Sequence, residues 1–87
     1  GIRFYAARRY PEAEKALAQA VLNDSSSPVS WYYLGAARWQ IGRREEAKSD
    51  FAQGAERELL RTMSASQVEQ ALASIQGPVR AAISDAR

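Results

Sequence analysis

The stretch that decides the fold runs from residue 28 to residue 61 and reads PVSWYYLGAARWQIGRREEAKSDFAQGAERELLR. Gly42 divides it into two helical segments, because glycine is the usual residue just past a helix C-terminus. In both segments small and apolar residues recur at helical spacing on one face: Trp31, Leu34 and Gly35 before the turn, and Ala47, Phe51, Gly54 and Ala55 after it. The stretch therefore predicts two helices joined by a short turn.

The rest of the chain is divided in the same way. Further breaks fall at Pro11, in the polar run 23–28, around residues 62–64 and at Gly77-Pro78, so that six pieces result. Ser64 is a suitable N-cap for the fifth piece, and a proline fits the first turn of a helix. No segment alternates apolar and polar residues long enough to indicate a half-buried strand. We therefore expect an all-α fold of five or six helices.

The pieces repeat one another at a separation of 34 residues. The matching pairs are Gly1 and Gly35, Tyr5 and Trp39, Arg9 and Arg43, Glu12 and Glu46, Ala13 and Ala47, Leu17 and Phe51, and Ala20 and Gly54. Ala47 recurs once more as Ala81. Ala-rich helices match by chance at one or two places, so this run indicates an internal repeat.

A helix-turn-helix unit of 34 residues resembles the tetratricopeptide repeat (TPR). Trp31, Leu34 and Gly35 match the W-x2-L-G opening of that family, and Ala47-x3-Phe51 matches its A-x3-F segment. Small residues let two helices approach closely while large ones fill the space between them. The sequence departs from the family pattern at Arg38, where the family prefers Tyr, and at Leu59, where the family prefers Pro.

The resemblance implies an α-solenoid of antiparallel helix pairs, stacked as a short right-handed superhelix. Residues 1–27 are then a first repeat that lacks its beginning, residues 28–61 a complete repeat, and residues 62–87 a degenerate repeat that caps the stack. The expected core consists of Leu17, Trp31, Leu34, Gly35, Ala47 and Phe51. Trp31→Ala is expected to cost about 3–5 kcal/mol, and Trp39→Ala much less if its ring faces an open groove.

In this family the first helix of each repeat lines a concave surface that receives peptides. The residues expected on that surface are Tyr5, Val29, Tyr32, Tyr33, Ala36, Trp39, Gln40 and Gln67, with Ile2 and Met63 beside them. Exposed aromatic side chains there would suit an apolar or extended peptide. The alternative is that these aromatic residues pack on neighbouring helices, and for Tyr5 and Tyr32 that alternative is favoured.

Some members of the family clamp the C-terminal carboxylate of chaperones with cationic side chains on this surface. The matching positions here are Ile2, Tyr33, Ala36, Met63 and Gln67, and none is a cation. Binding of a chaperone tail is therefore not expected.

Arginines interleaved with aromatic residues could grip a nucleic acid. The set is Arg3, Arg8, Arg9, Arg38, Arg43 and Arg44. Acidic residues lie close to them in sequence, however, and the net charge is only +2, from twelve Lys and Arg against ten Asp and Glu. Nucleic-acid binding is therefore a weaker alternative.

The sequence gives little support for a catalytic function. The chain has neither Cys nor His, so a thiolate metal site is impossible, and the commonest general base and the commonest neutral metal ligand are absent. The pairs Glu45-Glu46 and Glu56-x-Glu58 lie on one helix, where neighbours point apart, so both pairs are expected on the solvated surface. Lys48 and Asp50 are likewise expected to face water. We expect no enzyme activity, cofactor or metal.

The expected function is protein binding. We predict a scaffold that holds a peptide or a partner helix in its concave groove; the alternative is a structural or self-associating repeat segment. No apolar stretch approaches the roughly 18 residues that span a bilayer, and no signal-peptide pattern is present. A cytoplasmic location without membrane contact is therefore expected.

Overall fold

A computed structural model of the chain describes residues 2–60 and 64–87, and these residues form helices and connecting turns without a strand. The helices are α1 (Ile2–Ala6), α2 (Tyr10–Asn23), α3 (Pro28–Gln40), α4 (Arg44–Leu59), α5 (Ala65–Ala71) and α6 (Pro78–Ala86). The predicted all-α fold is confirmed. None of these helices combines the length and the apolar content needed to cross a bilayer.

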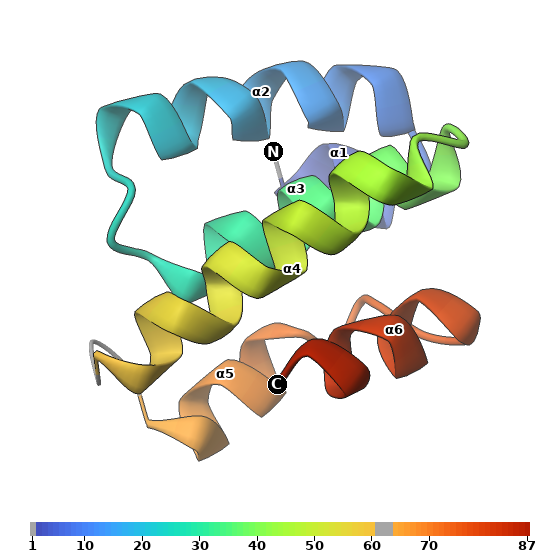
Figure 1. Cartoon of the computed structure of the whole chain (residues 1–87). Coiled ribbons are helices and arrows are strands. Elements are labelled where there is room, and N and C mark those ends of the chain that lie inside the picture. The colour runs from blue at the N-terminus through green and yellow to red at the C-terminus, as the bar shows by residue number, and fades with distance from the viewer. Residues whose placement is uncertain (1, 61–63) are drawn as a thin grey trace.

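The helices lie in three layers (Figure 1). The first layer contains α1 and α2, the second α3 and α4, and the third α5 and α6. Helix α3 is central, because it packs against α1, α2, α4, α5 and α6. This position explains why a helix with few charges is stable here: most of its surface is covered by neighbours.

The local sequence accounts for the helix ends. Pro11, Pro28 and Pro78 all lie in first turns, where a missing N–H costs nothing. Gly42 has a φ of +89°, a left-handed conformation that favours glycine and ends α3. Ser64 caps α5 as predicted, since its side chain accepts a hydrogen bond from the Gln67 backbone N–H.

Two glycines allow α3 and α4 to pack in close contact. A Cβ atom on Gly35 would lie 2.5 Å from a ring carbon of Phe51, and one on Gly54 would lie 2.6 Å from a ring carbon of Tyr32. Any larger residue would push the helices apart or displace these rings. The pair is therefore held by large rings seated on glycine backbone.

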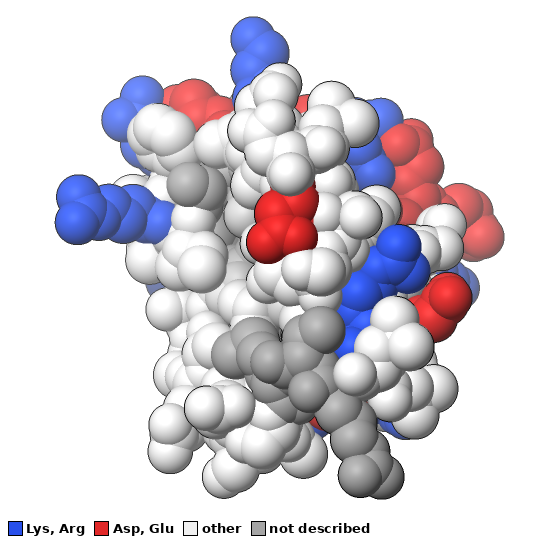
Figure 2. Space-filling view, turned by 90° about the vertical axis from the view of Figure 1, so that its left-hand side faces the viewer, with Lys and Arg blue, Asp and Glu red and all other residues white. Residues whose placement is uncertain are grey.

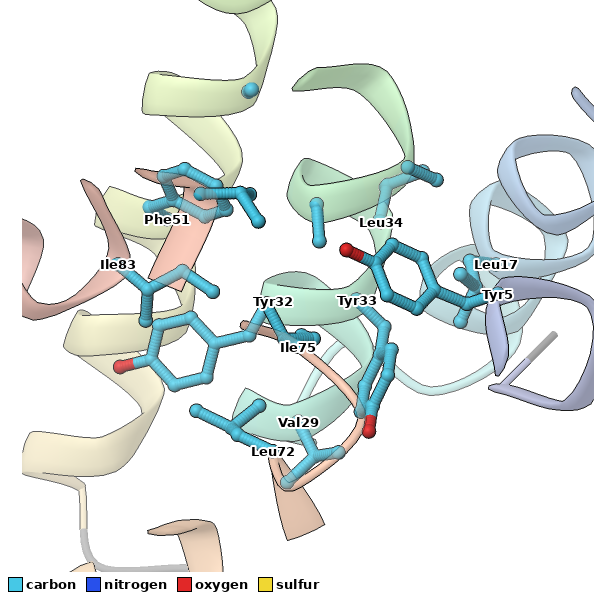
Figure 3. Close-up of a cluster of buried hydrophobic side chains, with 14 of the residues drawn as sticks. Tyr5, Leu17, Val29, Tyr32, Tyr33, Leu34, Phe51, Leu72, Ile75 and Ile83 are labelled. Carbon is cyan, nitrogen blue, oxygen red and sulfur yellow. The ribbon is translucent and has the colours of Figure 1, made fainter. Parts of the chain in front are cut away.

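The hydrophobic core runs through all three layers around α3 (Figure 3). The side chains of Tyr32 and Tyr33 point in different directions from α3, so these two neighbouring residues pack in different parts of the core. Five of the six expected core residues are buried: Leu17, Leu34, Gly35, Ala47 and Phe51.

The sixth expected core residue, Trp31, is only partly buried, so the expectation for it is wrong. Its indole Nε1 donates a hydrogen bond to the Ser25 carbonyl at 3.0 Å, and the Arg57 guanidinium lies 5.4 Å from the ring centroid. Trp39, not Trp31, packs on Phe51, with 6.3 Å between ring centroids. Trp31 therefore covers the 24–27 turn, and the centre of the pair is filled by Tyr32 and Phe51.

The structure also corrects the expectation for Asp50, which was expected to face water. The residue is buried, with only 4% of its surface exposed. Arg38 on α3 donates two hydrogen bonds to its carboxylate, at 3.0 and 3.1 Å. The same guanidinium reaches Glu14 on α2 at 3.3 Å. Arg38 therefore ties the first layer to the second. Burial raises the pKa of Asp50, although the neighbouring Arg38 opposes the change.

Candidate partner-binding site

The surface expected to form the groove is mostly covered. Five of its eight residues are buried, namely Tyr5, Val29, Tyr32, Tyr33 and Ala36, with exposed fractions of 0 to 7%. The expectation of an open aromatic groove does not hold for these five. Their side chains pack on neighbouring helices, which is the alternative reading of the sequence.

The physical reason is that α1 and α5 both pack on α3. Tyr5 on α1 and Tyr33 on α3 make an edge-to-face contact with 5.5 Å between ring centroids, a favourable geometry for aromatic pairs. The Tyr33 hydroxyl donates to the Ala71 carbonyl on α5 at 2.6 Å. Burial raises the pKa of Tyr5, which accepts a long hydrogen bond from Gln40 at 3.4 Å. These tyrosines connect the layers.

The other three expected groove residues are more accessible. Trp39 is half-buried between Phe51 and Arg44, whose guanidinium lies 4.8 Å from the indole centroid. Gln40 is exposed. Gln67 is exposed as well, but its side chain accepts a hydrogen bond from the Ser64 backbone N–H at 2.9 Å. Gln67 thus completes the α5 cap. Met63 lies outside the described residues.

An open cleft lies instead where α4 ends, α5 begins and α6 ends. Its volume is about 560 Å³, and the described residues that line it are Ala55, Glu58, Leu59, Ser64, Ala65, Ala86 and Arg87. Leu59 is 81% exposed and the adjacent Leu60 is 71% exposed. Figure 2 views the molecule from the side where α2 and α4 end; uncharged side chains cover much of the lower part of this face. We call this site the α4–α6 cleft.

The polar residues of the α4–α6 cleft are paired with each other. Arg87 donates to both carboxylate oxygens of Glu58, at 2.9 and 2.6 Å, and the Tyr32 hydroxyl donates to Glu58 at 2.7 Å. Burial would raise the pKa of Glu58, but the hydrogen bonds from Arg87 and Tyr32 lower it below its usual value. Burial and Glu58 raise the pKa of Tyr32. Glu58 was expected on the solvated surface, and its 15% exposed side chain corrects that expectation.

A second hollow is lined by the start of α1, the C-terminal half of α2 and the start of α3. Its volume is about 540 Å³, and it is lined by Ile2, Arg3, Phe4, Leu17, Ala20 and Ser30. Ile2 is 44% exposed. We call this site the α2 trough.

Three of the six arginines of the expected nucleic-acid set form ion pairs within the chain. Arg9 pairs with Glu12 at 2.7 Å, and Arg43 pairs with Glu46 at 2.5 Å. Arg38 is held by Glu14 and Asp50. Such pairing neutralises the charge that a phosphate backbone would meet. Among the described residues, moreover, no group of three or more acidic side chains is arranged to hold a metal ion.

Comparisons with family models, with curated proteins and with solved structures found no match for this chain. Sequence reasoning missed the α4–α6 cleft because its walls come from three segments that share no motif. One signal was present: Leu60 follows the core positions of α4 and lies off its apolar stripe.

Proposed function

We propose that the chain is a protein–protein interaction module of the TPR type that holds a peptide or a partner helix. Two features support the proposal. The 34-residue register relates residues 1–27 to residues 28–61, and Gly35 and Gly54 permit close helix packing at the positions where the repeat pattern has small residues. A binding module needs accessible apolar surface, and the chain has it.

The binding surface is assigned to the α4–α6 cleft in place of the concave groove. The observation that carries this assignment is the open cleft beside two exposed leucines, Leu59 and Leu60, on a chain whose tyrosines fill the expected groove. Exposed apolar side chains that adjoin one another and a cleft can receive a peptide or a helix.

The chemistry of the cleft favours an uncharged, apolar side chain as ligand. Ala55, Leu59, Ala65 and Ala86 provide apolar walls. Glu58 and Arg87 already form an ion pair with each other. A charged side chain of a ligand would therefore lose its hydration without finding an unpaired charge in the cleft. Burial of one large apolar side chain contributes about 1.5–3 kcal/mol, which gives a weak and reversible module unless several contacts add up.

The test is affinity capture with the purified chain, followed by titration of each captured protein in purified form. Leu59→Glu places a charge on the cleft, and Leu22→Glu is the matched control, because Leu22 is 79% exposed on α2. Proteins that bind the wild type and the Leu22→Glu variant but not Leu59→Glu support the proposal. If both variants capture the same proteins as the wild type, the cleft is not the binding surface.

Self-association is the second candidate function, and the same exposed leucines favour it. Leu59 and Leu60 each expose most of their surface, and two copies could bury them against each other. Sedimentation at several concentrations separates the two functions. A concentration-dependent dimer that Leu59→Glu dissolves would favour self-association, and a monomer at every concentration would exclude it.

A further inference from the structure

The turn between α1 and α2 holds an arginine in an unfavourable backbone conformation. Arg8 has a φ of +61°, which lies in the left-handed region that residues with a Cβ atom rarely adopt. The Arg8 N–H donates to the Tyr5 carbonyl at 2.9 Å, and the Arg9 N–H donates to the Phe4 carbonyl at 2.8 Å. This pair of hydrogen bonds is a common way to end a helix, and its left-handed residue is usually glycine.

The turn between α3 and α4 has the same structure with glycine at that position. Its two hydrogen bonds lie 34 residues later: Gly42 donates to Trp39 at 3.1 Å, and Arg43 donates to Arg38 at 2.8 Å. Gly42 has a φ of +89° and takes the place of Arg8. A Cβ atom on Gly42 would find open space among the described residues, with nothing within 4 Å beyond its chain neighbours. The two turns therefore differ in backbone strain, and the arginine lowers the stability of a turn that the chain also builds with glycine.

The Arg8 side chain makes no interaction in the described part of the chain that would offset this strain. It is exposed, and within residues 2–60 and 64–87 it forms no ion pair and no side-chain hydrogen bond. The neighbouring Arg9, in contrast, pairs with Glu12 at 2.7 Å. Backbone strain at an exposed side chain without an internal partner is an argument for a role in binding.

Arg8 lies on an edge of the stack that is formed by turns. Figure 1 shows the α1–α2 turn and the α3–α4 turn at the same end of the molecule. The two are adjacent, because the Arg43 guanidinium of the second turn lies 3.7 Å from the Glu14 carboxylate near the start of α2. Further helices that stack on the outer layers would cover the faces of the molecule and leave this edge open. Its exposure therefore does not depend on where the chain starts.

Two more residues complete this surface, which we call the turn edge and define by Arg8, Ile41 and Arg44. Ile41 is 37% exposed. Arg44 is exposed as well and has no acidic partner among the described residues; its guanidinium lies 4.8 Å from the Trp39 ring centroid. The turn edge thus presents two cations without a carboxylate partner and an exposed aliphatic side chain.

We propose that the turn edge binds an acidic segment of a partner protein, whose carboxylates pair with Arg8 and Arg44 and whose apolar side chain packs against Ile41. Complementary charge of this kind speeds association and fixes the orientation of the partner. The ligand differs from that of the α4–α6 cleft, which accepts an uncharged side chain.

The carboxylates around the turn edge favour an acidic peptide over a nucleic acid. Glu45 follows Arg44 directly, and its side chain is 93% exposed. A peptide has separate charges that can meet the two arginines and avoid Glu45. A nucleic acid has a continuous phosphate backbone, which would be repelled by the carboxylates on either side.

The probe is a fluorescently labelled synthetic peptide of glutamates around one central leucine. A control peptide has glutamine in place of every glutamate, and a labelled single-stranded oligouridylate tests for nucleic-acid binding. Titration with the whole chain at low and at physiological salt, followed by fluorescence anisotropy, gives each affinity. The glutamate peptide should bind more tightly than both controls, and its affinity should fall as salt is added.

The variant Arg8→Gly separates binding from folding, because the two should change in opposite directions. Its melting temperature should rise by about 2–6 °C, since relief of the left-handed strain outweighs the extra freedom of glycine in the unfolded chain. Gly42→Arg makes the reverse change in the second turn and should lower the melting temperature by a similar amount. A lower melting temperature for Arg8→Gly would show that the arginine stabilises its turn, which would overturn the proposal.

The same variant should bind the glutamate peptide about two- to fivefold more weakly at low salt, with a smaller dependence on salt. Combination with Arg44→Gln should weaken binding to about tenfold. Lys15→Ala is the matched control, because it removes one positive charge from an exposed position of α2 outside the turn edge, and it should leave the affinity nearly unchanged. Equal affinities of the wild type and Arg8→Gly would overturn the proposal.

Amide chemical shifts of the wild-type chain locate the peptide without any variant. Changes at Arg8, Ile41 and Arg44 support the proposal, whereas changes confined to Leu59 and Ala65 would place the peptide in the α4–α6 cleft and overturn it. The proposal also fails if the glutamine peptide binds equally well or if the oligonucleotide binds more tightly. Absence of binding at about 1 mM of the chain would overturn it too, because even a few such contacts give a dissociation constant in that range.

Discussion

The ring of Tyr32 lies against the backbone of Gly54 so closely that a Cβ atom there would stand 2.6 Å from the ring carbon Cε1. Tyr32 is fully buried, and its hydroxyl donates to Glu58 one turn further along α4. One side chain therefore fixes both the separation and the register of α3 and α4. Because α3 touches all the other helices, this contact supports the whole stack.

Gly54→Ala should lower the stability of the chain. Helix propensity alone would raise it by about 1 kcal/mol, but the added methyl group must displace the Tyr32 ring, which costs about 1–3 kcal/mol in a packed core. We expect a net loss of up to about 2 kcal/mol in urea unfolding. The reverse change at an exposed position of the same helix, Ala52→Gly, measures the propensity contribution separately. A more stable Gly54→Ala variant would contradict the packing described here.

The two tryptophans should contribute similar amounts to stability, contrary to the sequence-based expectation that Trp31 dominates. Both are partly buried, so each truncation should cost about 2 kcal/mol, less than the 3–5 kcal/mol of a fully buried ring. Trp39→Ala exposes Phe51, whereas Trp31→Ala removes the hydrogen bond to Ser25. Urea unfolding of the two variants, followed by circular dichroism, makes the comparison. A loss for Trp31→Ala more than about 2 kcal/mol larger than for Trp39→Ala would restore the original expectation.

The helix ends could be predicted from the sequence because the residues that start and end a helix act locally. Pro28, Gly42 and Ser64 act through their own backbone and their nearest neighbours, and each lies at a helix end as expected. The 34-residue register likewise identified small positions such as Gly35 and Gly54. These signals do not specify how far apart the layers of helices lie.

The candidate site could not be predicted for that reason. Burial of Tyr33 depends on α5 lying close enough for a hydrogen bond to Ala71, 38 residues away in sequence. Asp50 resembles its solvated neighbours in sequence, and only Arg38 on the facing helix reveals its role. Such partners are set by packing between helices, so a helical pattern read along one segment does not contain them.

The Ser64–Gln67 cap should stabilise α5 and, with it, the third layer. Both hydrogen bonds of a capping box are present, and replacement of such an N-cap by Ala costs about 1 kcal/mol. We expect Ser64→Ala and Gln67→Ala each to lower the unfolding free energy, and the double variant to lose less than the sum, because either change breaks the same motif. Gln70→Ala, an exposed position on the same helix, is the control. Additive losses would show that Gln67 acts independently of Ser64.

Stability should fall in acid partly because Glu58 becomes protonated. Its pKa is lower in the folded chain than in the unfolded one, so its contribution is fully present above the unfolded value, near 4.3, and is lost as the pH falls through the folded value. At pH 7, Glu58→Gln should cost about 1–3 kcal/mol, because it removes one of the two charged partners of Arg87 and leaves only Glu69. Below the folded pKa the wild type and the variant should converge. Glu56→Gln, whose carboxylate is more exposed on the same helix, should change little at either pH. Urea unfolding at pH 7, 5 and 3 measures all three chains, and a gap between wild type and Glu58→Gln that is constant with pH would show that the ion pair with Arg87 contributes nothing.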